Sequence, residues 1–164
     1  MTIAAILFDL ENKGALKVCR SVADIRGALA ACQIAAIFHI EGAEAIDPDL
    51  NSLEVLYQAG LRSIGPVWSR PNIFGHGVPF RYPSGSDIGP GLTDHGKRLV
   101  KRCDELGVMI DMSHLNAAGF CDVAHTSTKP FVATHPNAHG TCAHSRNLTD
   151  DQLAAIRDSD GMDG

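Results

Sequence analysis

Short apolar runs alternate with helix-like segments along most of this chain, and this alternation is the feature that most constrains its fold. Uninterrupted apolar runs are typical of strands buried on both faces of a parallel sheet. A series of strand–helix units predicts such a sheet, with right-handed crossovers. The predicted strands are IAAIFHI (34–40), LRSIGPV (61–67), VMIDMS (108–113) and PFVAT (130–134). The predicted helices cover residues 21–33, 47–60, 93–107, 116–127 and 149–160.

Capping residues support the helix boundaries. Ser21 and Asp24 have the spacing of a capping box, as do Thr149 and Gln152. Asp47 is the predicted N-cap of the helix that ends near residue 60. A Gly/Pro-rich loop is expected over residues 69–92.

The chain length sets the architecture. A complete (β/α)₈ barrel takes about 250 residues, whereas this chain has 164. We therefore predict an α/β fold that is a partial TIM-like (β/α) barrel of about four strand–helix units, with residues 1–164 forming one incomplete barrel domain. Because the final SDGMDG stops where another strand should begin, we expect a truncated chain.

Polar or aromatic residues follow the predicted strands at the point where each one ends. They are Glu41, Trp68, His114 and His135. The carboxyl ends of parallel strands share one edge of a sheet or one rim of a barrel, where sites form. We therefore expect these four side chains to lie on the same rim.

Each of these residues alone has an ordinary structural explanation, because a carboxylate or imidazole at a strand end often only caps the backbone. Together, one carboxylate and two imidazoles form a plausible hydrolytic zinc site, since catalytic zinc takes such ligands and keeps one position for water. Glu41, His114 and His135 are the predicted metal ligands.

Other polar residues carry weaker predictions. His39 is expected to face the helices. His76, between glycines in FGHGVPF, is either a mobile site residue or a plain loop histidine. Arg146 either makes a surface or capping contact or binds a substrate carboxylate through its guanidinium. The remaining histidines are expected on helix surfaces or in the loop after the last predicted strand: His95, His125, His139 and His144.

Composition excludes several classes of protein. The net charge of −5 argues against binding nucleic-acid phosphates. No apolar run is long enough to span a bilayer, and no signal peptide is evident. Five scattered cysteines indicate reduced thiols and a cytoplasmic location.

Several motifs in this order resemble the membrane (renal) dipeptidase family of zinc dipeptidases. They are HIEGAEAID, LTDHGKRLVKRCDELGVMIDMSHLN, PFVATHPNAH and SRNLTDDQL, and GPVWSRPNIFGHGVPF resembles the bacterial branch of this family. The resemblance implies a TIM-like barrel with two zinc ions and hydrolysis of a dipeptide by metal-activated water. It also implies that Glu41 bridges the two ions, that His114 and His135 bind one of them, and that Arg146 lies near the substrate's carboxylate.

The sequence departs from this family in three places. No His-x-Asp pair, which the first metal needs, precedes Glu41, and the late aspartate that takes part in proton transfer has no counterpart. Trp68 stands where animal members have a substrate-polarising histidine, which makes Trp68 a predicted substrate contact and His76 a candidate catalytic substitute. We therefore expect at most one well-formed zinc site. The alternative is an inactive half-barrel that binds one metal or none and acts as an interaction or structural fragment, forming a homo-oligomer in which exposed sheet edges pair.

Overall fold

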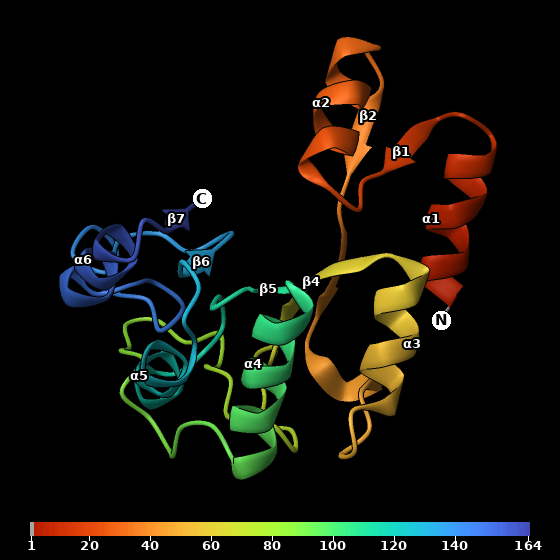
Figure 1. Cartoon of the computed structure of the whole chain (residues 1–164). Helices are drawn as coiled ribbons and strands as arrows, with labels where there is room; N and C mark the ends of the chain where they lie inside the picture. The colour runs from red at the N-terminus through yellow and green to blue at the C-terminus, as the bar shows by residue number, and fades with distance from the viewer. Residues whose placement is uncertain (1) are drawn as a thin grey trace.

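The computed structural model describes residues 2–164, and its helices alternate with parallel strands as the sequence predicts (Figure 1). Four units follow one another along the chain. They are β3 (Phe38–Glu41) with α3 (Asn51–Ala59), β4 (Leu61–Gly65) with α4 (Asp94–Leu106), β5 (Met109–Ile110) with α5 (Ala117–Thr126), and β6 (Val132–Ala133) with α6 (Asp150–Asp158). The chain is therefore a partial (β/α) barrel of the predicted kind.

The strands of these units are adjacent in space in the order in which they occur. β3, β4 and β5 form one parallel sheet. A single parallel bridge between Asp111 and Val132 continues it to β6. β6 also pairs in parallel with β7 (Met162–Asp163), which lies where the sequence predicts that a further strand begins. This consecutive order brings the carboxyl ends of β3, β5 and β6 to one edge.

The predicted strand over residues 34–40 is wrong in one respect, because it is two strands. β2 (Ile34–Ala36) pairs with β1 (Leu16–Val18), whereas β3 pairs with β4. The register also shifts between Phe38 and His39. The run changes partner halfway along its length, and its continuous hydrophobicity contains no sign of that change.

The first part of the chain holds elements that the sequence pattern did not predict. α1 (Thr2–Asn12) and β1 precede α2 (Val22–Ala30), and Figure 1 shows these elements apart from α4, α5 and α6. No residue of α1 is buried, and Ile3 and Ile6 are exposed. No helix within residues 2–164 has the length and apolar character needed to cross a membrane.

Caps fix the helix ends close to their predicted positions. Thr149 and Gln152 form the predicted capping box of α6, with both reciprocal hydrogen bonds present. Thr93 caps α4, which ends at Gly107 in the left-handed conformation that glycine adopts without strain. The prediction that Asp47 is the N-cap of this helix is wrong, because the N-cap residue of α3 is Leu50.

Asp47 still contributes to the start of α3. Its carboxylate accepts hydrogen bonds from the Ser52 hydroxyl and backbone N–H, both at 2.6 Å, and from the backbone of Asn51. The Ser52 hydroxyl, followed by these backbone donors, holds the pKa of Asp47 well below its usual range. The carboxylate thus satisfies N–H groups of the first turn from outside the helix.

The core lies between the helices and the outer face of the sheet. Its fully buried side chains come from strands, helices and the long loop over residues 69–92. They include Leu53, Leu61, Ile64, Phe74, Leu99, Val100, Met112, Val123 and Ile156. Burial of each such side chain stabilises the folded state by roughly 1.5–3 kcal/mol, so the helices are held against the sheet mainly by apolar contact.

The five free cysteines should divide into two reactivity groups. Cys19 and Cys103 are buried, and burial raises the pKa of Cys103 to about 12, which suppresses the reactive thiolate. Cys32, Cys121 and Cys142 are exposed. With Ellman's reagent at about pH 8, close to an ordinary thiol pKa, we expect the exposed group to react at once and the buried group only after unfolding. Rapid labelling of Cys103 in the native chain, located by mass spectrometry, would contradict this packing.

Candidate metal centre

Glu41, His114 and His135 meet at the carboxyl edge of the sheet. Glu41 ends β3, while His114 and His135 follow β5 and β6. Glu41 Oε1 lies 2.8 Å from His114 Nε2 and 3.0 Å from His135 Nε2, and the two Nε2 atoms are 3.0 Å apart. Three donor atoms from three separate strands therefore converge on one point.

The cluster is closed on one side and open on the other. The His114 side chain is only 1% exposed, whereas those of Glu41 and His135 are 42% and 39% exposed. A ligand can thus approach from the side of Glu41 and His135, while His114 forms the floor.

His114 has an unusual backbone conformation. Its φ of 70° lies in the left-handed region, which costs a non-glycine residue about 1–3 kcal/mol. Its carbonyl accepts a hydrogen bond from Val78 N at 2.9 Å, and its Nδ1 lies 2.9 Å from Ser69 Oγ. The long loop therefore holds both the backbone and the ring of His114, which leaves Nε2 directed at Glu41.

The pKa of His114 is lowered from its ordinary value, mainly by burial and then by the positive charge of Arg146, against the opposing effect of Glu41. Protonation of the ring is disfavoured in this position. Neutral imidazole is the form that coordinates metals, so this environment favours the ligating state.

The donor set fits a divalent metal such as zinc. Zinc accepts imidazole nitrogen and carboxylate oxygen, and its catalytic sites use three protein ligands. Ligands around a tetrahedral zinc lie roughly 3.3 Å apart, given Zn–N distances of about 2.0–2.1 Å. The distances of 2.8–3.0 Å observed here require only a small outward movement. Within residues 2–164, these three residues are the one group of three or more histidines, cysteines or carboxylates with this spacing.

Aromatic side chains and Arg146 flank the cluster. The Trp68 ring lies 6.1 Å from the His114 ring and 5.6 Å from Phe80, centroid to centroid. Arg146 places its guanidinium carbon 5.3 Å over the Phe80 ring, and its Nη2 lies 3.5 Å from the His135 carbonyl oxygen. Its buried Nε has no hydrogen-bond partner among residues 2–164. The predicted substrate contacts Trp68 and Arg146 thus lie beside the predicted ligands.

His76 lies elsewhere in the long loop. Its ring is beside Gly89, and its backbone carbonyl accepts a hydrogen bond from Asn116 N at 3.3 Å. The Nδ1 atom is buried without a partner in the described part of the chain. The structure does not bring this ring into the Glu41 cluster, and the catalytic role of His76 stays a prediction.

The expectation that His39 faces the helices is wrong. His39 Nδ1 lies 2.8 Å from Ser63 Oγ, and its Nε2 lies 4.0 Å from Asp111 Oδ2, on the sheet face that carries Glu41. Alternate residues of a strand share a face, so the position of Glu41 two residues later already indicated this. Burial, only partly offset by Asp111 and Glu41, lowers the pKa of His39.

Sequence reasoning missed three polar residues around the cluster: Ser69, Asp111 and Thr134. Asp111 is buried at 1% exposure. Burial raises its pKa, but hydrogen bonds from Thr134 and Ser113 together outweigh burial and lower it overall. The sequence did indicate that Asp111 is unusual, because it is a carboxylate inside the largely apolar run VMIDMS.

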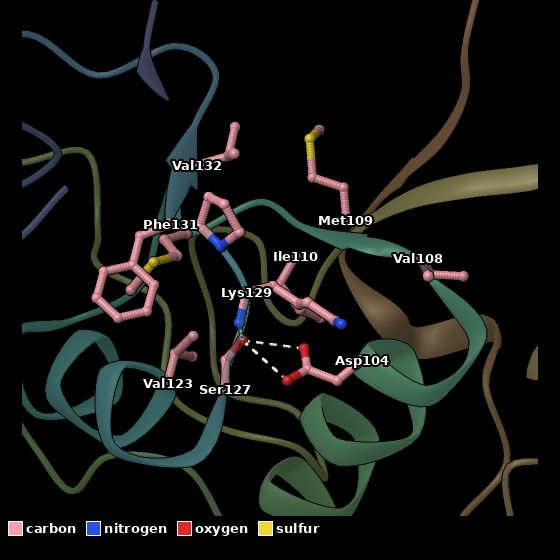
Figure 2. Close-up of a pocket in the computed structure, with 12 residues that line it drawn as sticks. Asp104, Val108, Met109, Ile110, Val123, Ser127, Lys129, Phe131 and Val132 are labelled. Atoms are coloured by element: carbon pink, nitrogen blue, oxygen red, sulfur yellow. Dashed lines mark hydrogen bonds between the residues drawn. The ribbon is translucent and has the colours of Figure 1, made fainter. Parts of the chain in front are cut away.

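An apolar pocket of about 290 Å³ lies away from this cluster. Figure 2 shows it between α4, α5, β5 and β6, lined by residues such as Val108, Ile110 and Phe131. Its polar contact, from Ser127 Oγ to Asp104 Oδ1 at 2.9 Å, joins α5 to α4. Because none of the three converging donors lines it, we place the candidate site at the cluster rather than here.

Comparison with known proteins adds family and structural matches. The model of the membrane dipeptidase family (peptidase family M19) matches residues 6–163. A crystal structure of a metallo peptidase from Rhodobacter sphaeroides, liganded with a phosphinate mimic of the dipeptide L-Ala-D-Ala, is 53% identical with a TM-score of 0.97. That match covers 98% of this chain and 46% of that one.

Two further matches cover nearly the whole of this chain. The probable dipeptidase PvdM from Pseudomonas aeruginosa is 27% identical with a TM-score of 0.88, over 98% of this chain and 41% of that one. An uncharacterized protein in the pqqA 5' region of Klebsiella pneumoniae is 48% identical over 162 residues, which is 98% of this chain and 60% of that protein. The chain thus spans about half the length of the relatives it matches.

Zinc binding should depend on the three converging side chains. We expect His114→Ala or His135→Ala to weaken zinc binding at least about tenfold, because each removes a direct ligand. Removing a group that only hydrogen-bonds to a ligand already lowers metal affinity about 10–100-fold. Calorimetric zinc titration measures this. His125→Ala is the matched control, because His125 is an exposed histidine on α5 that bonds the Cys121 carbonyl of its own helix. Unchanged zinc binding in both site variants would place the metal elsewhere, for example at His139, His144 or Cys142.

Proposed function

The chain belongs to the membrane dipeptidase family, peptidase family M19, and from this premise we propose that its Glu41–His114–His135 cluster is part of the catalytic centre of a zinc-dependent dipeptidase. The observation that carries this proposal is the convergence of one carboxylate oxygen and two imidazole nitrogens within 3.0 Å of one another. The sequence separates these residues by more than 20 positions, so the fold rather than local spacing assembles them.

In this proposal, Glu41, His114 and His135 hold the metal. A divalent metal held there supplies a nucleophile at neutral pH by lowering the pKa of water, and it polarises the scissile carbonyl. The low exposure of His114 keeps one face of the centre dry, which strengthens electrostatic interactions there. The exposed side of Glu41 and His135 is where the substrate enters.

Arg146 is the proposed anchor for the substrate's terminal carboxylate. Its guanidinium lies over the Phe80 ring, and its Nη2 makes only a 3.5 Å contact with the His135 carbonyl oxygen, so the guanidinium keeps donors for a carboxylate. A guanidinium binds a carboxylate through two parallel hydrogen bonds. An anchor this close to the cluster favours substrates whose free carboxyl end lies one residue from the scissile bond, which describes a dipeptide.

The Rhodobacter relative indicates the kind of dipeptide, because it is liganded with a mimic of L-Ala-D-Ala. We propose that small dipeptides of this class bind here, with Trp68 contacting the substrate beside His114. A second candidate function is a metal-binding chain without catalytic activity. It is favoured by the finding that residues 2–164 contain one three-residue ligand group rather than two.

Ligand binding tests the proposed function without requiring turnover. We expect the zinc-loaded chain to bind a phosphinate mimic of L-Ala-D-Ala, and Arg146→Ala to weaken that binding about tenfold or more, since a hydrogen bond to a charged group contributes about 1.5–3 kcal/mol. Arg157→Ala is the matched control, because Arg157 is exposed on α6 and pairs with Asp158. Binding that is independent of zinc, or equal in the Arg146 and control variants, would contradict the proposal.

Turnover by the 164-residue chain alone should be poor. The ligand pair for a second metal and the late aspartate of the family are absent from its sequence, so the second ion of a two-metal site and one proton-transfer group are missing. A ninhydrin or coupled assay of L-Ala-D-Ala hydrolysis with added zinc measures this. Robust turnover that is zinc-dependent and lost in Glu41→Ala would show that this centre needs only one ion.

A further inference from the structure

Asp111 occupies a position that connects the two histidine-bearing strand ends. It follows β5 and bridges to Val132 of β6. Its Oδ1 accepts hydrogen bonds from the backbone N–H of Ser113 at 3.0 Å and from that of Thr134 at 3.1 Å. Ser113 directly precedes His114, and Thr134 directly precedes His135. One carboxylate oxygen therefore joins the backbones that carry both imidazoles.

The second oxygen of Asp111 reaches the ring of His135 through a hydroxyl. Thr134 Oγ1 donates its only proton to Asp111 Oδ2 and lies 2.8 Å from His135 Nδ1. A hydroxyl that has donated its proton can only accept at its other contact. This arrangement favours the ring proton on His135 Nδ1, which leaves the lone pair of Nε2 for a metal. Nε2 is the atom that faces Glu41 and His114.

We propose that Asp111 and Thr134 are positioning residues that set the separation of the two histidines and fix the tautomer of His135. The proposal rests on the proposed metal centre, to which it adds a carboxylate–hydroxyl–imidazole relay. Histidine ligands commonly donate their second ring proton to such partners, which orient the ring. Here the direct distance from Asp111 Oδ2 to His135 Nδ1 is 3.9 Å, too long for a hydrogen bond, so the Thr134 hydroxyl has to mediate.

The environment of Asp111 supports a role beyond strand pairing. Strand pairing alone uses Oδ1, whereas Oδ2 is directed at side chains of the sheet face that carries Glu41. His39 Nε2 lies 4.0 Å from the same oxygen, and Ser63 Oγ holds His39 Nδ1 at 2.8 Å. Thr134 itself is exposed, so its hydroxyl contributes little to the core.

Thr134→Val separates the relay from the backbone connection, because it removes the hydroxyl and leaves the Thr134 N–H bonded to Oδ1. Nitrogen-15 NMR of the imidazoles reports the His135 tautomer in the metal-free chain. We expect the wild type to hold the proton on Nδ1, Thr134→Val to shift it towards Nε2, which faces the Glu41 carboxylate, and Thr134→Ser to restore the wild-type state. Asp111→Asn should also shift the proton towards Nε2, because the amide can donate to the Thr134 hydroxyl, which is then free to donate to His135 Nδ1.

Zinc calorimetry is the second readout. We expect Thr134→Val to weaken zinc binding about 10–100-fold and Thr134→Ser to bind like wild type. Thr141→Val is the control, since the Thr141 side chain is exposed and forms no hydrogen bond within residues 2–164. Circular dichroism checks that each variant is folded.

The two readouts separate this inference from the proposed function. An unchanged His135 tautomer in folded Thr134→Val would overturn the relay, whatever the zinc affinity. A wild-type chain that binds no zinc, but whose His135 tautomer still depends on Thr134, would support the positioning role and contradict the metal centre. Equal zinc binding by wild type and Thr134→Val would overturn the claim that the relay assists the ligand.

Discussion

Parallel pairing of consecutive strands is the constraint on which the candidate site depends. Glu41, His114 and His135 are far apart in the sequence, and no turn or helix spacing brings them together. Pairing of β3 with β4 and β4 with β5, extended to β6 by the bridge between Asp111 and Val132, places three strand ends at one edge. The apolar faces of α3 to α6 stabilise this arrangement from outside, so the core and the site have the same structural origin.

Polar groups then refine what the strands bring together. Asp111 is buried and accepts hydrogen bonds at both oxygens, so its desolvation is compensated and it can hold two strand ends at a fixed distance. Ser69 orients His114 from the other side, and the left-handed backbone of His114 is held by the same loop. The site is therefore assembled by the sheet and adjusted by a small set of buried hydrogen bonds.

The sequence predicted the strand–helix units, the Ser21 cap of α2, the capping box of α6 and the common location of the strand-end residues, because periodicity and capping are local signals. It did not predict the break at Ile37 or the elements α1 and β1, because strand partners and short edge elements are decided by distant segments. The sheet face on which His39 lies was predictable, because Glu41 follows it by two residues on the same strand and alternate residues share a face. The prediction nevertheless placed His39 towards the helices. The relay through Thr134 could not be predicted, because it depends on distances between two strands that only the assembled sheet defines.

The three-ligand metal centre is tested most directly by a crystal structure of the zinc-loaded chain with anomalous diffraction data at the zinc edge. We predict one anomalous peak within bonding distance, about 2.0–2.2 Å, of Glu41 Oε1, His114 Nε2 and His135 Nε2. A peak at Cys142, His139 or His144 instead, with none at the carboxyl edge of β3, β5 and β6, would contradict it.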